Sequence, residues 1–501
     1  MTSKSPSPAG FALRKHPHLY EINTWAWLEE LSAQMDRPVK LVDVPDGEWD
    51  ALAKLGFDIV WLMGMWQRSP ESQRIMREDR SNDAGYGRAL PGWTPADVVA
   101  SPYAVAGYAP DPRIGTWETL DRVREKLHRR GMGVFLDFVG NHTALDHPWT
   151  LEHPEFYFWG TQQDYEQNPS AFYPMRAPGG TRFLVLAKDP FFPPWKDVAQ
   201  LNHFHPGMRA AQLQDLRTIA QHCDGVRCDM AMLHLRDIFA RGWGHFLAGA
   251  APPAKEFWDV AHAAVPRLTL LAEAYWGTET RLLELGFSFA YDKRLYDAVR
   301  DENAGDARAV VSAPPDYQAH FARFLENHDE ARCAAVFGGR QPAAATFMGT
   351  LPGMRFYHQG ELGGRRTQLP ITLRMAAPEP DDPATKALFE IILRITNEEV
   401  FHSGRWSALD VTPEGEPAIG NLIVYEWRSK DAWKVIAVNL GSWSAQGRVH
   451  IGERASVAFT YDFNDELNGV HYPRSGEELR NVGLFVRLDA HQAHLFDVTP
   501  A

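Results

Sequence analysis

The chain has 501 residues, 45% of them hydrophobic and 23% charged, so it can bury a large core and is neither a disordered nor a low-complexity protein. The formal net charge is −13 and Lys and Arg form no runs, which argues against a nucleic-acid-binding protein. The first residues contain no apolar leader, and no stretch approaches the ~20 apolar residues of a membrane span. The three cysteines form neither a disulfide framework nor a C-x-x-C zinc pair. These features favour a cytoplasmic protein and leave its oligomeric state open.

The first 142 residues combine a polar lead with alternating strands and helices. Residues 1–18 are predicted to be a flexible lead. The elements predicted after it are a strand at Tyr20–Leu28, a helix at Trp49–Phe57, a buried strand at Asp58–Trp66, a helix at Thr116–Gly131 and a buried strand at Gly133–Val139. The second helix has the clearest signals, because Thr116 can cap its start, apolar residues recur along one face and Gly131 can end it.

Residues 143–205 interrupt this alternation. They hold many Pro, Gly and aromatic residues and no long periodic segment, so they are predicted to be a domain inserted after the third strand. The aromatic residues either form the small core of this domain or wall off and shorten a binding cleft. These residues are Trp149, Phe156, Tyr157, Phe158, Trp159, Tyr165, Phe172, Tyr173, Phe183, Phe191, Phe192 and Trp195.

The alternation resumes after residue 205. Helix patterns such as Met208–Cys223 alternate with strands such as Gly225–Ala231 and Leu268–Tyr275, and eight strands are predicted in all. This order predicts an α/β fold, a closed (β/α)8 TIM barrel built from residues 19–142 and 206–400. The tail, residues 401–501, is predicted to be a separate antiparallel β-domain without helices. Its predicted strands are Asn421–Ser429, Trp433–Gly441, Val457–Phe463 and Leu484–Val498.

Polar side chains gather at the predicted C-terminal ends of four barrel strands, where barrel enzymes place their reacting groups. They are Asp137, Asn141 and His142 after the third strand, Arg227 and Asp229 on one face of the fourth, Glu273 in the fifth, and Glu326, His328 and Asp329 in the seventh. Each residue alone is explained more simply as a helix cap, a turn or a salt-bridge partner. Together they indicate an active site, because buried acids are costly unless they are paired or functional. Cleavage of a glycosidic bond requires two carboxyl groups that face one cleft.

Four motifs in this order, DFVGNH, GVRCDMA, AEAYWG and ENHD, resemble those of family 13 of the glycoside hydrolases, the α-amylase family. The segment PGMRFYHQGELG (Pro352–Gly363) is similar to the family's eighth strand and the loop after it. The resemblance runs from about Tyr20 to the C-terminus. It implies a (β/α)8 barrel with a domain inserted after strand three and a C-terminal antiparallel β-sandwich. It also implies a hydrolase that acts on α-linked glucosides and retains their configuration.

The resemblance assigns roles to seven residues. Asp229 is expected to be the nucleophile, Glu273 the general acid and base, and Asp329 the group that binds sugar hydroxyls in the transition state. Arg227 is expected to orient Asp229. His142 and His328 are expected to donate or accept hydrogen bonds with the sugar, and Tyr103 to stack on it. The apolar neighbours of Glu273 favour the raised pKa that a general acid needs at neutral pH. Met230, which follows the expected nucleophile, matches neither common linkage pattern, so the linkage stays open.

Many members of this family bind calcium between the barrel and the inserted domain. Asn141 matches one of the family's ligands, but Gln200 stands where the family has an acidic ligand and Leu233 where it has a histidine. Calcium prefers carboxylate oxygens. We therefore expect no calcium here, and no other metal or cofactor.

The expected substrate is a small carbohydrate, preferably a short α-glucoside. A transglycosylase, phosphorylase or isomerase of the same family is an alternative, because these activities share the same residues and differ in water exclusion and acceptor binding. A non-catalytic binding protein is a second alternative, which the retention of Asp229, Glu273 and Asp329 disfavours. A barrel enzyme for another substrate class is compatible with the fold, but the four motifs argue against it.

Overall fold

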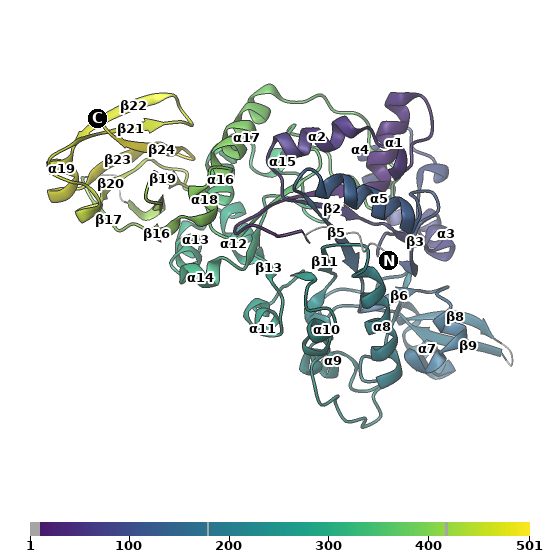
Figure 1. Cartoon of the computed structure of the whole chain (residues 1–501). Helices are drawn as coiled ribbons and strands as arrows, with labels where there is room; N and C mark the ends of the chain where they lie inside the picture. The colour runs from purple at the N-terminus through teal and green to yellow at the C-terminus, as the bar shows by residue number, and fades with distance from the viewer. Residues whose placement is uncertain (1–10, 178–179, 416–418) are drawn as a thin grey trace, which may run out of the picture.

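Eight parallel strands close into a barrel at the centre of the molecule (Figure 1). The computed structural model describes residues 11–177, 180–415 and 419–501. The barrel strands are β1 (His18–Asn23), β2 (Ile59–Met63), β5 (Gly133–Phe138), β11 (Gly225–Cys228), β12 (Thr269–Ala272), β13 (Phe289–Tyr291), β14 (Phe321–Arg323) and β15 (Met354–His358). Each strand neighbours the next one along the chain, and β15 pairs with β1 to close the ring. The predicted TIM-barrel fold is confirmed.

The helices of the barrel pack around these strands. They include α5 (Trp117–His128), α8 (Pro206–Ile219), α10 (Phe257–Ala264), α16 (Gln341–Thr350) and α17 (Pro383–Thr396). In α5 the predicted cap is present, because the Thr119 backbone N–H donates to Thr116 Oγ1 at 3.2 Å. Leu120, Val123 and Leu127 are buried on one face of α5, as the apolar periodicity predicted.

The first barrel strand is shorter than predicted. β1 ends at Asn23, and α1 (Thr24–Met35) takes up the rest of the predicted strand Tyr20–Leu28. The Ala26 backbone N–H donates to Asn23 Oδ1 at 3.3 Å, so Asn23 caps the helix and ends the strand. β1 begins at His18, the last residue of the predicted lead; residues 1–10 of that lead lie outside the described residues.

The chain makes a long excursion outside the barrel between β2 and β5. It contains β3 (Trp66–Arg68), α3 (Pro70–Glu78), α4 (Asp83–Ala89) and β4 (Val105–Pro110). The predicted strand Asp58–Trp66 therefore falls into two, with β2 in the barrel and β3 outside it. Tyr86 and Val98 of this excursion pack against Leu373, which anchors the segment to the loop after β15. The excursion carries Tyr103 to the site described below.

The chain between β5 and β11 forms the insertion after the third barrel strand. β7 (Trp159–Gly160), β9 (Gly180–Val185) and β8 (Phe172–Ala177) make one antiparallel sheet, and β6 (His142–Ala144) pairs with β10 (Val198–Gln200). Figure 1 shows this part extending away from the barrel at the lower right. Most of its aromatic residues form two cores, one around Phe156 and Tyr157 and the other around Phe158, Phe172 and Phe183. The first core lies mainly within the insertion, whereas the second is shared with Phe239, Trp243 and Leu247 of the segment after β11, so it also joins the insertion to the barrel.

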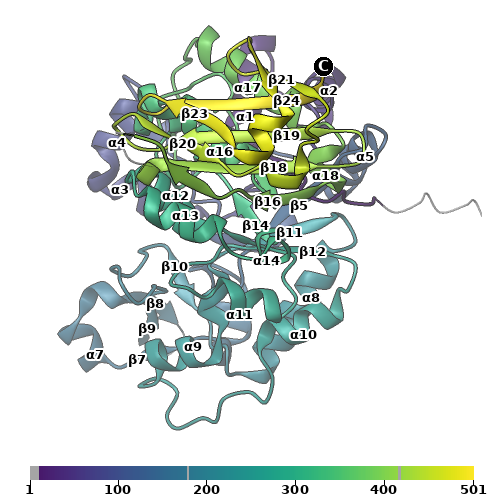
Figure 2. The ribbon, with the colours of Figure 1, turned by 90° about the vertical axis from the view of Figure 1, so that its left-hand side faces the viewer.

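Two antiparallel sheets form the C-terminal part (Figure 2). The six-stranded sheet consists of β16 (Arg405–Ala408), β18 (Leu422–Arg428), β19 (Trp433–Asn439), β24 (Ala493–Pro500), β21 (Thr460–Asp465) and β22 (Val470–Ser475). The three-stranded sheet consists of β17 (Val411–Pro413), β20 (Ala445–Val449) and β23 (Leu484–Leu488). Two details differ from prediction: the tail contains helix, in α19 (Gly476–Asn481) and in most of α18 (Val400–Ser403), and the predicted strand Leu484–Val498 is split by a turn into β23 and β24.

The C-terminal part is anchored to the barrel through buried polar contacts. Trp427 Nε1 donates to the Thr350 carbonyl at 2.7 Å, and the Tyr425 and Thr350 hydroxyls lie 2.6 Å apart. Thr350 is the last residue of α16, so this barrel helix is the docking surface for the six-stranded sheet. These buried groups find their hydrogen-bond partners across the boundary, and so they fix the position of the C-terminal part on the barrel.

Candidate active site

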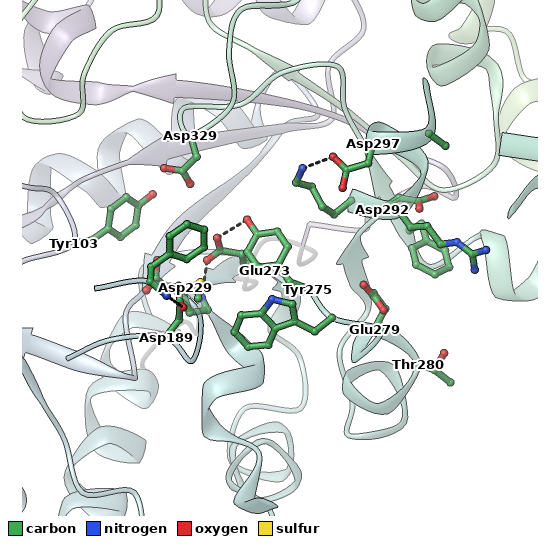
Figure 3. Close-up of a pocket in the computed structure, with 18 of the residues that line it drawn as sticks. Tyr103, Asp189, Asp229, Glu273, Tyr275, Glu279, Thr280, Asp292, Asp297 and Asp329 are labelled. Atoms are coloured by element: carbon green, nitrogen blue, oxygen red, sulfur yellow. Dashed lines mark hydrogen bonds and ion pairs between the residues drawn. The ribbon is translucent and has the colours of Figure 1, made fainter. Parts of the chain in front are cut away.

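The C-terminal ends of the barrel strands open into a cavity of about 1300 Å³. Figure 3 shows that Asp229, Glu273 and Asp329 face this cavity from separate strands, with Tyr103 beside Asp329. Five of the seven residues predicted from the motifs line it, namely Tyr103, His142, Asp229, Glu273 and Asp329. The other two, Arg227 and His328, are buried in contact with them. The structure therefore brings all seven residues into one site.

Arg227 links the three acids. Its Nη1 lies 2.7 Å from Asp229 Oδ1, because alternate residues of β11 point to the same face. Its Nη2 lies 2.8 Å from Glu273 Oε2 and 3.9 Å from Asp329 Oδ2. The guanidinium is 1% exposed, so both close contacts form out of water, where the charge of each partner is needed to offset the cost of burial. One guanidinium that contacts both Asp229 and Glu273 keeps their carboxyl groups close together.

The backbone of Met230, the residue after Asp229, is strained, and this conformation lets it bind the Glu273 side chain. Met230 has φ of 42°, in the left-handed region that non-glycine residues rarely adopt. In this conformation its backbone N–H donates to Glu273 Oε2 at 2.6 Å. Strain of this kind is kept where the surrounding structure enforces it, commonly at functional sites. The Met230 backbone thus couples the end of β11 to the side chain that follows β12.

Burial and neighbouring charges set the protonation of the two central acids. Burial, reinforced by the nearby carboxylates Asp229 and Asp329, raises the pKa of Glu273 to about 7 against the opposing effect of Arg227. Burial also raises the pKa of Asp229 above its ordinary value, although Arg227 favours its charged form. The Tyr275 hydroxyl donates to Glu273 Oε1 at 2.8 Å, as the dashed line in Figure 3 shows. At neutral pH, Glu273 can therefore hold a proton, while the contact with Arg227 favours the charged form of Asp229.

Asp329 differs from the other two acids. Its side chain is 45% exposed, and its Oδ2 lies 3.0 Å from His328 Nε2. Partial enclosure by the cavity walls raises the pKa of Asp329, but the positive charges of His328 and Arg227 outweigh that effect and bring the pKa down to about 2. The Tyr103 hydroxyl lies 2.8 Å from His328 Nε2, and the two rings stack with centroids 5.3 Å apart. Asp329 is therefore a carboxylate throughout the physiological pH range.

The position where family resemblance implies calcium does not fit a divalent cation. Gln200 Nε2 donates to the Asn141 carbonyl at 3.1 Å, to Asn141 Oδ1 at 3.2 Å and to the Leu201 carbonyl at 3.0 Å. An amide –NH2 group thus lies among the oxygens that could otherwise face a cation, and no carboxylate joins them. Among the described residues, no cluster of three or more His, Cys, Asp or Glu side chains is arranged to hold a metal ion.

Three residues of the site were not predicted as site residues. Tyr275, two residues after Glu273, donates a hydrogen bond to that carboxyl group. Trp61 of β2 underlies the site, with its ring 5.6 Å from the Arg227 guanidinium and 5.7 Å from the His328 ring. Glu21 of β1 contacts His328 from below. Glu21 is the only acidic residue of β1, and only its charge in a buried segment could have indicated a role.

Part of the sequence matches a model of a known protein family. A family model described as the alpha amylase catalytic domain matches residues 48–243. Alpha-amylase 3 of Dictyoglomus thermophilum is 24% identical over 278 residues, which are 50% of this chain and 51% of that protein. The trehalose synthase/amylase TreS of Mycobacterium tuberculosis is 25% identical over 352 residues, 66% of this chain and 53% of that protein. The match places residues 48–243 in the α-amylase catalytic-domain family.

Solved α-amylase structures share the fold of nearly the whole chain. A noncanonic maltogenic alpha-amylase, AmyB from Thermotoga neapolitana, superposes with a TM-score of 0.65 at 17% identity, over 96% of this chain and 98% of that one. At this identity the likeness concerns the fold. The chain spans about half the length, or less, of the curated relatives it matches. Within the described residues, none of the helices is both long and apolar enough to traverse a membrane.

Proposed function

We propose that this chain is a retaining α-glucoside hydrolase. The observation that carries this proposal is the buried Arg227 guanidinium that contacts both Asp229 and Glu273 at the mouth of an α-amylase-family barrel. Retaining glycosidases need two carboxyl groups only about 5–5.5 Å apart, and a shared guanidinium supports such a separation. A screen of small α-glucosides and starch with identification of the products tests the proposal, and the absence of any glucoside cleavage would contradict it.

In the first step, Glu273 would act as the general acid and Asp229 as the nucleophile. The proton that Glu273 carries passes to the glycosidic oxygen, so the leaving sugar departs as an alcohol. The Asp229 carboxylate forms a bond to the anomeric carbon as the bond to the leaving oxygen breaks. Its contact with Arg227 at 2.7 Å fixes the attacking oxygen and keeps the group ionised.

In the second step, Glu273 would reverse its role. As a carboxylate it accepts a proton from water, and the water oxygen attacks the anomeric carbon and displaces Asp229. Two inversions at the same carbon restore the α configuration. Asp329, held ionised by His328 and Arg227, would bind sugar hydroxyls as positive charge develops on the ring, and Tyr103 and His142 would line the same sugar.

Transfer to an acceptor other than water is the second candidate. The chain resembles a trehalose synthase/amylase over 66% of its length, and the same covalent intermediate would serve a transglycosylase, isomerase or phosphorylase. The charge of the cavity disfavours a phosphorylase, because ten carboxylate side chains line it against two cations, Lys293 and Arg294, and Lys293 is paired with Asp297 at 2.6 Å. Product analysis with maltose or sucrose, with and without phosphate, distinguishes these activities.

A contact at the rim of the cavity favours the proposal that the substrates are short. Phe191 of the insertion and Trp276 after β12 meet with ring centroids 5.0 Å apart, although their side chains are 67% and 41% exposed. The backbone N–H groups of Phe191 and Phe192 both donate to Asp189 Oδ1, at 2.6 and 2.9 Å, which fixes the loop. We infer that this contact between the insertion and the loop after β12 hinders the passage of a long glucan, while the cavity of about 1300 Å³ can hold a short oligosaccharide.

We therefore expect kcat/KM for maltose or sucrose to exceed that for soluble starch. Trp276→Ala, which removes the cavity-lining ring of this contact, should open the rim and raise activity on starch relative to activity on the disaccharide. Leu151→Ala is the matched control, because Leu151 is an exposed residue of the insertion, at 69%, that does not line the cavity. A wild-type preference for polymer, with internal cleavage and a rapid fall in iodine staining, would show that the cleft is open.

We also expect activity to survive a chelator. The Gln200 amide donates hydrogen bonds to the oxygens of Asn141 and Leu201 at the base of the insertion, so these oxygens already have a partner. Incubation with EDTA followed by dialysis should therefore leave kcat and the melting temperature unchanged, and added calcium should raise neither. Loss of activity in EDTA that calcium restores would show that a metal is required.

A further inference from the structure

Glu21 is a carboxylic acid buried beneath the active site, and it is not among the seven residues that the motifs identify. It lies in the middle of β1 between β2 and β15, and it is 0% exposed. Its Oε1 lies 2.5 Å from His328 Nδ1, and its Oε2 has no hydrogen-bond partner among the described residues. A buried carboxylate with one unsatisfied oxygen is costly, so its retention calls for a reason.

His328 lies between two carboxylates. Nδ1 faces Glu21 at 2.5 Å, and Nε2 faces Asp329 Oδ2 at 3.0 Å and the Tyr103 hydroxyl at 2.8 Å. A neutral imidazole carries one N–H, so its other nitrogen would present a lone pair to a carboxylate. Only the imidazolium donates to both sides. The rings of Trp61 and Tyr103 pack against His328 and restrict the plane of its ring.

We propose that Glu21 is a positioning residue, which holds His328 as an imidazolium with its Nε2–H directed at Asp329 and the cavity. This inference deepens the proposed function and rests on it. Without the charge of Glu21, the buried ring would lose the partner that compensates its own charge. The neutral ring could then place its proton on Nδ1 and turn a lone pair towards Asp329, which would weaken the hold on the carboxylate that binds the sugar.

The surrounding charges determine how His328 titrates. Carboxylates outnumber cations around it, and Glu21 and Asp329 are the two that touch it. The titratable and charged groups that face it from the packed elements are Glu21 of β1, Tyr103 before β4, Asp137 of β5, Arg227 of β11, Asp229 after β11, Asp329 of its own loop and His358 of β15. Removing the charge of Glu21 therefore removes one of only two direct partners that favour the cation.

The test uses Glu21→Gln, which keeps the shape and an acceptor oxygen but removes the charge. We expect kcat to fall about 10- to 100-fold on a small α-glucoside, in the range seen when an outer partner of a functional histidine is removed. Glu361→Gln is the matched control: Glu361 is also buried beside β15, but it accepts from the His358 backbone and does not contact His328. It should keep wild-type kcat.

Nitrogen-15 spectra of histidine-labelled protein provide the readout that a merely structural role would not change. His328, assigned by the signal lost in His328→Gln, should carry protons on both nitrogens in the wild type from pH 6 to pH 8 and on one nitrogen in Glu21→Gln. A neutral His328 in the wild type would overturn the proposal, and so would Glu21→Gln activity within twofold of wild type. The wild-type titration decides the matter if Glu21→Gln does not fold. The titration needs no turnover. Failure to find a substrate would therefore contradict the proposed function, while the protonation of His328 could still be measured.

Discussion

Replacement of Asp229 by Asn is expected to abolish turnover in a protein that stays folded. The amide has the shape of the carboxylate but cannot attack the anomeric carbon, so the covalent intermediate does not form. We expect kcat/KM to fall by roughly 10⁴-fold or more, equivalent to about 5.4 kcal/mol of transition-state stabilisation. Steady-state kinetics on a small α-glucoside measure the effect, and circular dichroism checks the fold.

Asp215→Asn is the control for Asp229→Asn. Asp215 lies on α8 outside the cavity, and burial raises its pKa to about 7, so removal of its charge tests the general effect of losing a partly buried acid. This variant should keep wild-type kinetics. Asp229→Asn activity within about tenfold of wild type, a difference of only ~1.4 kcal/mol, would exclude Asp229 as the nucleophile.

Replacement of Glu273 by Gln should slow cleavage of substrates with poor leaving groups by about 10²- to 10⁴-fold, the usual contribution of a general acid. α-Glucosyl fluoride, whose leaving group needs little protonation, should be affected much less in its first step. Pre-steady-state and steady-state rates on maltose and on the fluoride measure this contrast. Equal losses on both substrates would mean that Glu273 does not donate the proton.

The pH profile provides a second check on Glu273. A general acid acts in its protonated form, and the pKa of Glu273 is raised to about 7, so wild-type activity is present below pH 7 and falls as the pH rises through that value. Glu273→Gln has no proton to lose there and should lack this basic limb. On the acid side, activity should fall as Asp229 is protonated, at a pH above the ordinary range of an aspartate because burial raises its pKa.

The predicted site agrees with the structure because its residues share a simple geometric rule. Parallel barrel strands end at one face, so Asp229, Glu273 and Asp329 had to meet if the strand positions were correct. Arg227 was predicted to pair with Asp229 from the two-residue period of a strand, and the contact is 2.7 Å. These inferences needed only the order of strands, which the alternating pattern and the four motifs supply.

The remaining features depend on contacts between residues far apart in the chain. Glu21 and His328 are 307 residues apart, and nothing in the sequence near Glu21 indicates its partner. The end of β1 at Asn23 depends on a single cap, which competes with the β propensity of the aromatic residues around it. The bridge between Phe191 and Trp276 likewise joins two loops whose approach follows from the packing of the insertion on the barrel.

Proton NMR of the first product formed from an α-glucoside tests the paired roles of Asp229 and Glu273 most directly. Two displacements at the anomeric carbon predict that the α anomer appears first and that the β anomer grows later by mutarotation. A single displacement by water, with the carboxyl groups about 6.5–9.5 Å apart, would give the β anomer first. An initial β anomer would contradict the covalent mechanism and the role of Asp229 as nucleophile.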